Sequence, residues 1–332
     1  MGIELVLAEM EKANKILIET QLGMKKGDEM LIPTTEEFLG VAKSAQAYAD
    51  GIGVRAYVVL VPPIERGTYP KALQSMANEV DGIYSLGMGF STKEALDHGT
   101  RLLGVILDDE TLVRTLVRVN LPKLKEEAWK IRDAISDCET LRITSHNGTD
   151  FTEDRHGKIG SPGGMWAGDP WEELYEFSPL GYPGYARYPP LGTCNGKLVY
   201  DLYLTPFGLI REPVVCTIVK DEIVKVEGGW EAKRFWNNIK DWPEKFLAEM
   251  QIGINPNARM PGKGPEWERY RGGVHFGMGS IMPYPAFGEN GKLLNPDWKP
   301  AKFHCDGMMA APTVYADDKL IVKDGILQHP YD

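Results

Sequence analysis

Residues 253–280 read GINPNARMPGKGPEWERYRGGVHFGMGS, and residues 302–315 read KFHCDGMMAAPTVY. In an extended chain, residues i and i+2 point to the same side, so a strand in the second stretch would project His304 and Asp306 together. His275, within VHFGMG, could approach them from a neighbouring strand. Two histidines and one carboxylate form the facial ligand set of non-haem Fe(II) oxygenases, and the same residue types hold catalytic zinc. The pattern therefore predicts a metal site at these three residues.

A structural role is the main alternative for these residues. An HxD triplet is short enough to arise by chance, and a histidine in an apolar strand is more often a satisfied core residue. The chain has only six histidines, however, and two of them fall in this region. Gly277 and Gly279 lack a Cβ, so backbone or substrate could come close beside His275. These observations favour the metal site.

Several segments together carry a family resemblance. They are GINPNAR, Glu268, GGVHFGMG, HCDG and PTVYADDKLIVKDG, with LRITSHNGTDFT upstream at 141–152. This set resembles the aminopeptidase T and aminopeptidase S family of metallopeptidases. It also resembles that family's non-peptidase relatives, the 2,5-dihydroxypyridine 5,6-dioxygenases. The likeness covers residues 138–325 and, in outline, the N-terminal part of the chain.

The chain departs from the two-metal pattern that the resemblance implies for the peptidases, in which carboxylates bridge the ions. One family glutamate lies in a PGE segment, but the matching stretch 183–186 reads PGYA, whereas the second glutamate matches Glu268. A tyrosine is expected seven residues after His275, where this chain has Met282, with Tyr284 two residues further on. The remaining ligands form a mononuclear set, which favours the dioxygenase-like relatives.

The resemblance therefore implies an Fe(II) dioxygenase that opens the ring of a small hydroxylated aromatic or N-heteroaromatic compound, such as 2,5-dihydroxypyridine, with O2. A metallo-aminopeptidase or related hydrolase with Zn, Co or Mn is the alternative, and a silent binding protein is a third reading. Glu268 is either a partner that orients His275 or an exposed charge. His98 and His146 are candidates for the base that deprotonates the ring hydroxyl, or else ordinary surface histidines.

An aromatic-rich segment over 157–193 could form a wall for a flat ring, because aromatic side chains stack on rings and long loops are often functional. The alternative is a loop that folds over the core. The substrate-binding residues expected from this segment and from the loop after His275 are Trp166, Trp171, Tyr185, Arg187 and Tyr284. Arg187 would suit a phenolate or carboxylate substituent.

Composition limits the other classes of function. The chain has 332 residues, of which 43% are hydrophobic and 25% charged, as in ordinary globular proteins. Its net charge of −10 argues against a nucleic-acid partner, and the absence of an apolar run of about 20 residues argues against a membrane span. The four cysteines have no CxxC spacing and no secretion signal precedes them, so we expect reduced thiols in a cytoplasmic protein. A homo-oligomer is also expected.

Residues 1–137 alternate between helical and strand-like segments, which predicts an α/β domain with a parallel sheet flanked by helices. No GxGxxG follows the first strand, so a dinucleotide site is not expected. Residues 138–332 are rich in β-branched residues, glycine and aromatics, which predicts a β-rich α+β domain that binds the metal. Within it, one helix is expected over 230–250.

Overall fold

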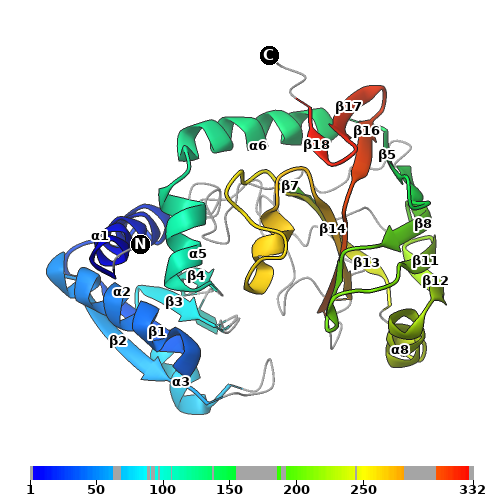
Figure 1. Ribbon diagram of the computed structural model, residues 1–332. Helices are drawn as coiled ribbons and strands as arrows, with labels where there is room; N and C mark the ends of the chain where they lie inside the picture. Colours follow the sequence, from blue (N-terminus) through cyan, green and yellow to red (C-terminus); the bar gives the residue numbers. More distant parts are fainter. Residues whose placement is uncertain are drawn as a thin grey trace. The chain divides into compact units, whose positions relative to one another are not determined.

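The computed structural model describes most of the chain (Figure 1). The backbone is described for residues 3–62, 69–87, 90, 94–95, 98–105, 107–136, 138–154, 185–187, 192–243, 245–279 and 304–328. Within these ranges, the side chains at 3–7, 125, 129, 132–133, 136, 185–187, 248–249, 264–265 and 304 lie outside the description. The chain forms two compact units, and each is described by itself.

Unit 1 contains Met1–Leu121 and, from much later in the sequence, Asn255–Trp267. Its four-stranded sheet is wholly parallel in the order β2-β1-β3-β4, as the βα alternation predicts. The elements are α1 (Ile3–Asn14), η1 (Lys15–Gln21), β1 (Glu29–Thr34), η2 (Glu36–Phe38), α2 (Leu39–Gly51), β2 (Arg55–Leu60), α3 (Lys71–Ala77), β3 (Gly82–Leu86), β4 (Arg101–Val105), α5 (Asp109–Leu112) and η3 (Val113–Val117). No helix among the described residues is long and apolar enough to cross a membrane.

Strand β1 is covered on both faces, as period-two alternation in a buried strand requires. Leu31 belongs to an apolar cluster that includes Leu73 of α3, whereas Met30 and Ile32 belong to a second cluster that includes Ala42 of α2. All three β1 side chains are fully buried. Burying each such side chain contributes about 1.5–3 kcal/mol, so this strand anchors the unit.

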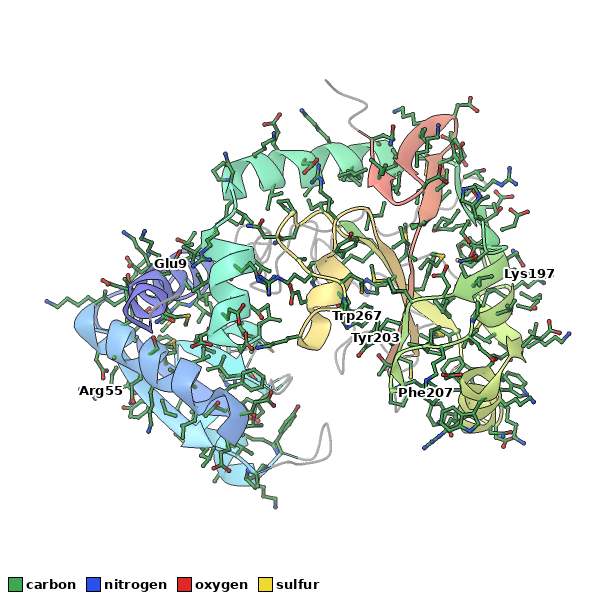
Figure 2. The ribbon with its side chains drawn as sticks, viewed as in Figure 1. Glu9, Arg55, Lys197, Tyr203, Phe207 and Trp267 are labelled. Carbon is green, nitrogen blue, oxygen red and sulfur yellow. The ribbon has the colours of Figure 1, made fainter. Side chains whose placement is uncertain are left out.

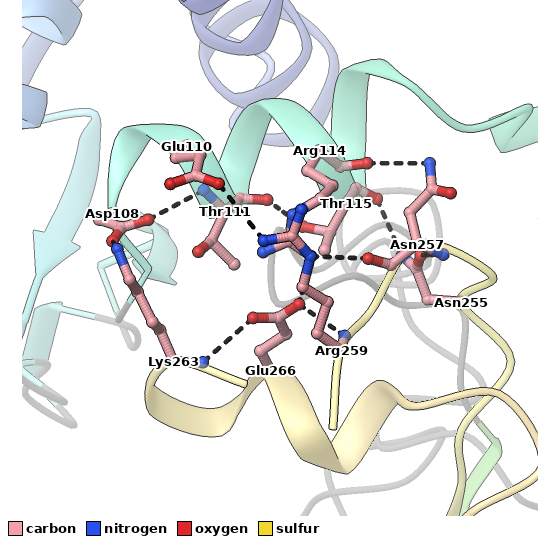
Figure 3. A network of polar contacts seen from close by, with 10 residues as sticks. All are labelled: Asp108, Glu110, Thr111, Arg114, Thr115, Asn255, Asn257, Arg259, Lys263 and Glu266. Atoms are coloured by element: carbon pink, nitrogen blue, oxygen red, sulfur yellow. Dashed lines mark hydrogen bonds and ion pairs between the residues drawn. The ribbon is translucent and has the colours of Figure 1, made fainter. Parts of the chain in front are cut away.

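The segment 255–267 is attached to η3 by side-chain amides (Figure 3). The Nδ2 atom of Asn255 donates a hydrogen bond to the carbonyl oxygen of Thr115, at 2.8 Å. The Nδ2 atom of Asn257 donates to the carbonyl oxygen of Arg114, at 3.1 Å. These bonds satisfy carbonyl groups at the end of a helical segment, which have no partner within their own helix.

A buried ion pair lies at the centre of the same network (Figure 3). The Glu266 carboxylate pairs with the Arg114 guanidinium, and the two side chains are 1% and 12% exposed. Glu266 also accepts hydrogen bonds from the backbone N–H groups of Arg259 and Lys263, at 2.7 and 3.1 Å. The Lys263 ammonium in turn lies 2.6 Å from the Asp108 carboxylate. A buried charge is tolerated when it is paired and hydrogen-bonded in this way.

Unit 2 contains Pro122–Glu172, Pro183–Ile254 and Glu268–Asp332. Its described residues form the helices α6 (Leu121–Ser136) and α8 (Trp230–Ile239) and two sheets whose strand pairings are antiparallel. The eight-stranded sheet has the order β12-β11-β8-β6-β5-β16-β17-β18, and the six-stranded sheet has the order β10-β9-β15-β14-β13-β7.

The strands of the eight-stranded sheet are β5 (Thr140–Ser145), β6 (Asp150–Asp154), β8 (Cys194–Tyr200), β11 (Val214–Val219), β12 (Glu222–Gly228), β16 (Pro312–Ala316), β17 (Lys319–Lys323) and β18 (Ile326–Leu327). Those of the six-stranded sheet are β7 (Tyr185–Arg187), β9 (Tyr203–Leu204), β10 (Gly208–Leu209), β13 (Leu247–Ile252), β14 (Val274–Gly279) and β15 (His304–Met309). A further short helix, η4 (Gly264–Arg269), precedes β14. The predicted β-rich character of this part of the chain is confirmed, whereas the division at residue 137 into separate domains stays a prediction.

The two sheets of unit 2 share one apolar core. Phe151 on β6 and Phe276 on β14 meet edge to face, with ring centroids 5.0 Å apart and an interplanar angle of 66°. The ring of Tyr200 on β8 occupies the space where a Cβ at Gly307 on β15 would lie. Glycine is therefore required at this position for the two sheets to approach each other.

The expected helix over 230–250 is wrong in its second half. Helix α8 ends at Ile239, and residues 247–252 form strand β13 between β14 and β7. Pro243 explains the break, because proline lacks an N–H and disfavours a helical conformation in the residue before it. The correction places LAEMQI, the sequence of β13, beside the strand that carries His275.

Candidate metal centre

The register of β14 and β15 brings the predicted ligands to one face of the six-stranded sheet. Gly277 lies opposite Asp306 and Gly279 lies opposite His304, while His275 lies opposite Met308. Because directly opposite residues share a face and alternate residues repeat it, positions 275, 304 and 306 belong to the same face. The predicted strand with an HxD spacing is present as β15.

The two described side chains of this set lie close together. His275 Nε2 is 4.0 Å from Asp306 Oδ1, and the side chains are 1% and 14% exposed. This distance is beyond a direct hydrogen bond. The side chain of His304 lies outside the described residues. A neutral imidazole and a carboxylate at close range form two members of a metal-ligand set.

Two glycines make room beside these ligands. Gly277 and Gly279 occupy the positions opposite Asp306 and His304, so no side chain from β14 fills the space there. Among the side chains that the structure describes, no three His, Cys, Asp or Glu residues gather into a metal-binding group, and His304 is not one of those side chains. The donor types and the space beside them suit a metal that keeps positions open for other molecules.

The opposite face of β14 and β15 packs into the apolar core and so anchors the strands that carry the predicted ligands. Val274, Phe276 and Met278 alternate with the site-facing residues of β14 and are buried in the shared core. Cys305 packs against that core too, and burial together with the neighbouring Asp306 charge raises the pKa of its thiol to about 12. Its thiol is therefore protonated at neutral pH, and its register position is on the face opposite the ligands.

Sequence comparisons assign the chain to a family. The profile of 2,5-dihydroxypyridine 5,6-dioxygenase (NicX) matches residues 25–329. The chain belongs to this dioxygenase family. Membership supports a dioxygenase-like enzyme that acts on a small molecule with O2. No curated protein sequence matches the chain at a significant level.

Solved structures agree with this assignment at the level of the fold. The 2,5-dihydroxypyridine dioxygenase from Pseudomonas putida KT2440 matches with a TM-score of 0.74 and 20% identity, covering 100% of this chain and 99% of that one. Wild-type AmpT from Thermus thermophilus matches with a TM-score of 0.68 and 13% identity, covering 96% and 99%. The dioxygenase family member described here therefore has a fold similar to both proteins, as the resemblance predicts.

Sequence reasoning missed two polar residues near the predicted ligands, because the helix predicted over 230–250 covered most of β13. Gln251 lies opposite His275, and Glu249 lies opposite Gly277, so both positions belong to the face of the predicted ligands. The side chain of Glu249 lies outside the described residues, whereas Gln251 is fully buried. The alternation of polar Glu249 and Gln251 with apolar Met250 and Ile252 is the signal that could have revealed the strand.

Glu268 forms an ion pair and is mostly buried. Its carboxylate pairs with the guanidinium of Arg269, and the side chains are 14% and 3% exposed. The reading of Glu268 as an exposed charge is therefore wrong, because little of the side chain meets solvent. Its predicted role in orienting His275 stays a prediction.

The two candidate bases lie in exposed positions. The Nδ1 atom of His98 lies 2.6 Å from the carbonyl oxygen of Glu94 within unit 1. His146, in the turn between β5 and β6, is 83% exposed and its Nε2 lies 3.1 Å from Asp324 Oδ1. These surroundings are those of ordinary surface histidines, so a catalytic role for either one rests on the sequence prediction.

The expected substrate-binding residues are described only in part. Tyr185 and Arg187 lie opposite Ile252 and Met250, so their register positions belong to the core-facing side of the sheet and not to the face of His275. Their side chains lie outside the described residues. Trp166, Trp171 and Tyr284 lie wholly outside the described residues.

Proposed function

We propose that the chain is a mononuclear Fe(II) dioxygenase that opens the ring of a small hydroxylated aromatic or N-heteroaromatic compound related to 2,5-dihydroxypyridine. The observation that carries this proposal is the shared face of His275, His304 and Asp306, with glycines opposite two of them. Membership of the dioxygenase family supports the same reaction class. Fe(II) is the metal that a set of two histidines and one carboxylate with open positions suits best.

The residues of the chain would divide the work as follows. His275, His304 and Asp306 would hold the metal, and Fe(II), when bound, supplies positions where a hydroxylated ring and O2 can be held side by side. The glycines at 277 and 279 leave the space in which such a ring could lie. His275 is 1% exposed, and electrostatic interactions are stronger in such a buried environment than in water.

Other parts of the proposal rest on the sequence. A base is needed for the ring hydroxyl, and His98 and His146 stay the candidates. Trp166 and Trp171 stay predicted walls for the ring. The expected partners are the aromatic substrate and O2, with no nucleic acid, and the protein is expected to be a cytoplasmic homo-oligomer.

Oxygen consumption tests the proposal. The apoprotein is loaded anaerobically with Fe(II) or with Zn(II), mixed with 2,5-dihydroxypyridine or a related diol, and followed with an oxygen electrode. Uptake of O2 by the Fe(II) form, with none by the Zn(II) form, is expected. If no diol causes uptake while Zn, Co or Mn loading releases amino acids from aminoacyl amides, the protein is a hydrolase and the proposal fails.

The aminopeptidase alternative keeps one observation in its favour. Position 249 carries a glutamate on the face of the predicted ligands, directly opposite Gly277. A second carboxylate near Asp306 is what a two-metal site would need. The hydrolase assay above therefore belongs in the same experiment.

A further inference from the structure

Gln251 is a fully buried carboxamide, and neither end has a hydrogen-bond partner among the described residues. Its side chain is 0% exposed, and neither Oε1 nor Nε2 makes a hydrogen bond within the part of the chain that the structure describes. Burying such a group without partners opposes folding, and most buried polar groups in proteins are satisfied. An unsatisfied amide in a functional region therefore points to a partner that arrives from outside the chain.

The position of Gln251 identifies where that partner would lie. It is opposite His275 on the same sheet face, and its diagonal neighbours are Gly277 on β14 and Gly273, the residue just before that strand. On the other side, its register partner on β7 is Ala186. The neighbouring positions on this face are therefore His275 and three small residues, Gly273, Gly277 and Ala186. Because Gln251 makes no hydrogen bond to His275, it is not the group that holds the imidazole ring in place.

The distance to the ligands suits a six-membered ring. Gln251 on β13 and Asp306 on β15 are separated by one intervening strand, which corresponds to about 10 Å between the outer strands. The two positions are also offset by two residues along the strands, so their Cα atoms are about 12 Å apart, a separation that the two side chains and one small ring can span. A ring held by a hydroxyl near His275 and Asp306 would present its opposite edge to the carboxamide.

We propose that Gln251 binds the substrate, and that it reads the N–H and C=O groups of a hydroxypyridine in its pyridone form. This inference rests on the proposed function and adds a residue that would determine which ring the site binds. A primary carboxamide offers one acceptor and one donor side by side, and a 2-pyridone edge offers the complementary donor and acceptor. The pairing is the same in kind as the two hydrogen bonds that glutamine makes to adenine. A carbocyclic phenol has no N–H to complete it.

Binding under anaerobic conditions tests the inference without turnover. Calorimetry on the metal-loaded protein would compare 2,5-dihydroxypyridine, in its 2-pyridone form, with hydroquinone. Both rings carry a hydroxyl for the metal, and they differ at the edge that faces Gln251. The wild type should bind the 2-pyridone about tenfold or more tightly than hydroquinone, and Gln251→Leu should remove the preference. Gln251→Glu, which keeps the acceptors and loses the N–H donors, should lose most of the preference. Metal content is measured on each variant to show that the site is intact.

Gln21 provides a matched control. It is also a buried glutamine, 1% exposed, with neither amide atom hydrogen-bonded in the described part of the chain, but it lies in unit 1. Gln21→Leu should leave the preference for 2-pyridone unchanged. If wild type shows no preference, or if Gln251→Leu keeps it, Gln251 is satisfied by water only and the inference is overturned.

Failure of the inference and failure of the proposed function give different results. Preferential 2-pyridone binding that depends on Gln251, without O2 uptake on any diol, would keep the inference and reject the dioxygenase. O2 uptake that is equal for wild type and Gln251→Leu, and equal for 2,5-dihydroxypyridine and hydroquinone, would keep the dioxygenase and reject the inference.

Discussion

At the scale of single residues, the ligand set makes the most direct prediction. His275→Ala, His304→Ala and Asp306→Ala should each lose most of the bound metal, because each removes one of three donors. The fold should persist, since the core of unit 2 lies on the other face of these strands. Metal analysis and circular dichroism measure the two effects. His146→Ala is the control, and equal metal loss in that variant would contradict the assignment.

The lowered pKa of Asp108 predicts that the stability of the fold decreases at acidic pH. Burial would raise the pKa of its carboxyl, but hydrogen bonds from Lys263 and Thr111 and the Lys263 charge lower it overall. The folded-state pKa is therefore below the unfolded value of about 4. The resulting stability is present above pH 4 and is lost as the pH falls through the lower, folded-state pKa.

Asp108→Asn isolates this contribution. Asparagine can still accept the hydrogen bond from Thr111 N at the start of α5, but it cannot pair with Lys263. We expect Asp108→Asn to be less stable than wild type at pH 7, and the difference to shrink at about pH 3. Urea unfolding at both pH values measures this. If the difference in unfolding free energy between wild type and Asp108→Asn is the same at both pH values, the ion pair with Lys263 does not contribute to stability.

The sequence anticipated two described residues of the candidate site and missed a third. His275 and Asp306 follow from the period of a strand, which is a local property. Gln251 was missed because the run from Trp230 was extended past Pro243 as a helix. Its importance also depends on its having no hydrogen-bond partner within the described ranges, which only three-dimensional packing reveals.

At the scale of elements, Gly307 sets how closely β15 approaches β8. A Cβ at this position would overlap the ring of Tyr200. Gly307→Ala should therefore destabilise the protein by about 1–3 kcal/mol, as overpacking in a core does. Gly104→Ala is the matched control, because a Cβ there meets no atom within 4 Å. Chemical unfolding measures both, and equal stability of the two variants would contradict the packing argument.

Helices and strands were predictable where the hydrophobic periodicity agreed with the turn-forming residues at the ends of each segment. Alternating βα segments indicated the parallel sheet of unit 1, and the strands β14 and β15 were readable from their alternation. On β9, Tyr203 (labelled in Figure 2) pairs with Met308 of β15. Strand β9 has only two residues, which is too short to leave a sequence pattern. Such short strands are determined by their neighbours in the sheet.

At the scale of the whole molecule, the metal count separates the two reaction classes. The expected stoichiometry is one metal per chain, because the glutamate of the PGE segment is absent from 183–186. Elemental analysis of the fully loaded protein, referred to protein concentration, measures this number. Two metals per chain in the wild type, falling to one in Glu249→Gln, would support the two-metal alternative.

The assignment of 255–267 to unit 1 could not be predicted from the sequence. Its contacts join residues that are about 140–150 positions apart, such as Asn255 with Thr115 and Glu266 with Arg114. Nothing in the local pattern of GINPNAR or PGKGPEW encodes the partner. The resemblance indicated that this stretch matters, but not that it folds with the first 121 residues.

This same stretch restricts how the gene can be cut and recombined. A truncated chain that starts at Pro122 would carry residues 255–267 without Arg114 and Thr115, so the buried Glu266 carboxylate would lose its counter-charge. Removing one partner of a buried pair destabilises by about 3–5 kcal/mol. Hybrids that join the first 121 residues of one relative to the rest of another should therefore be soluble only when residues 255–267 are inherited together with the first part.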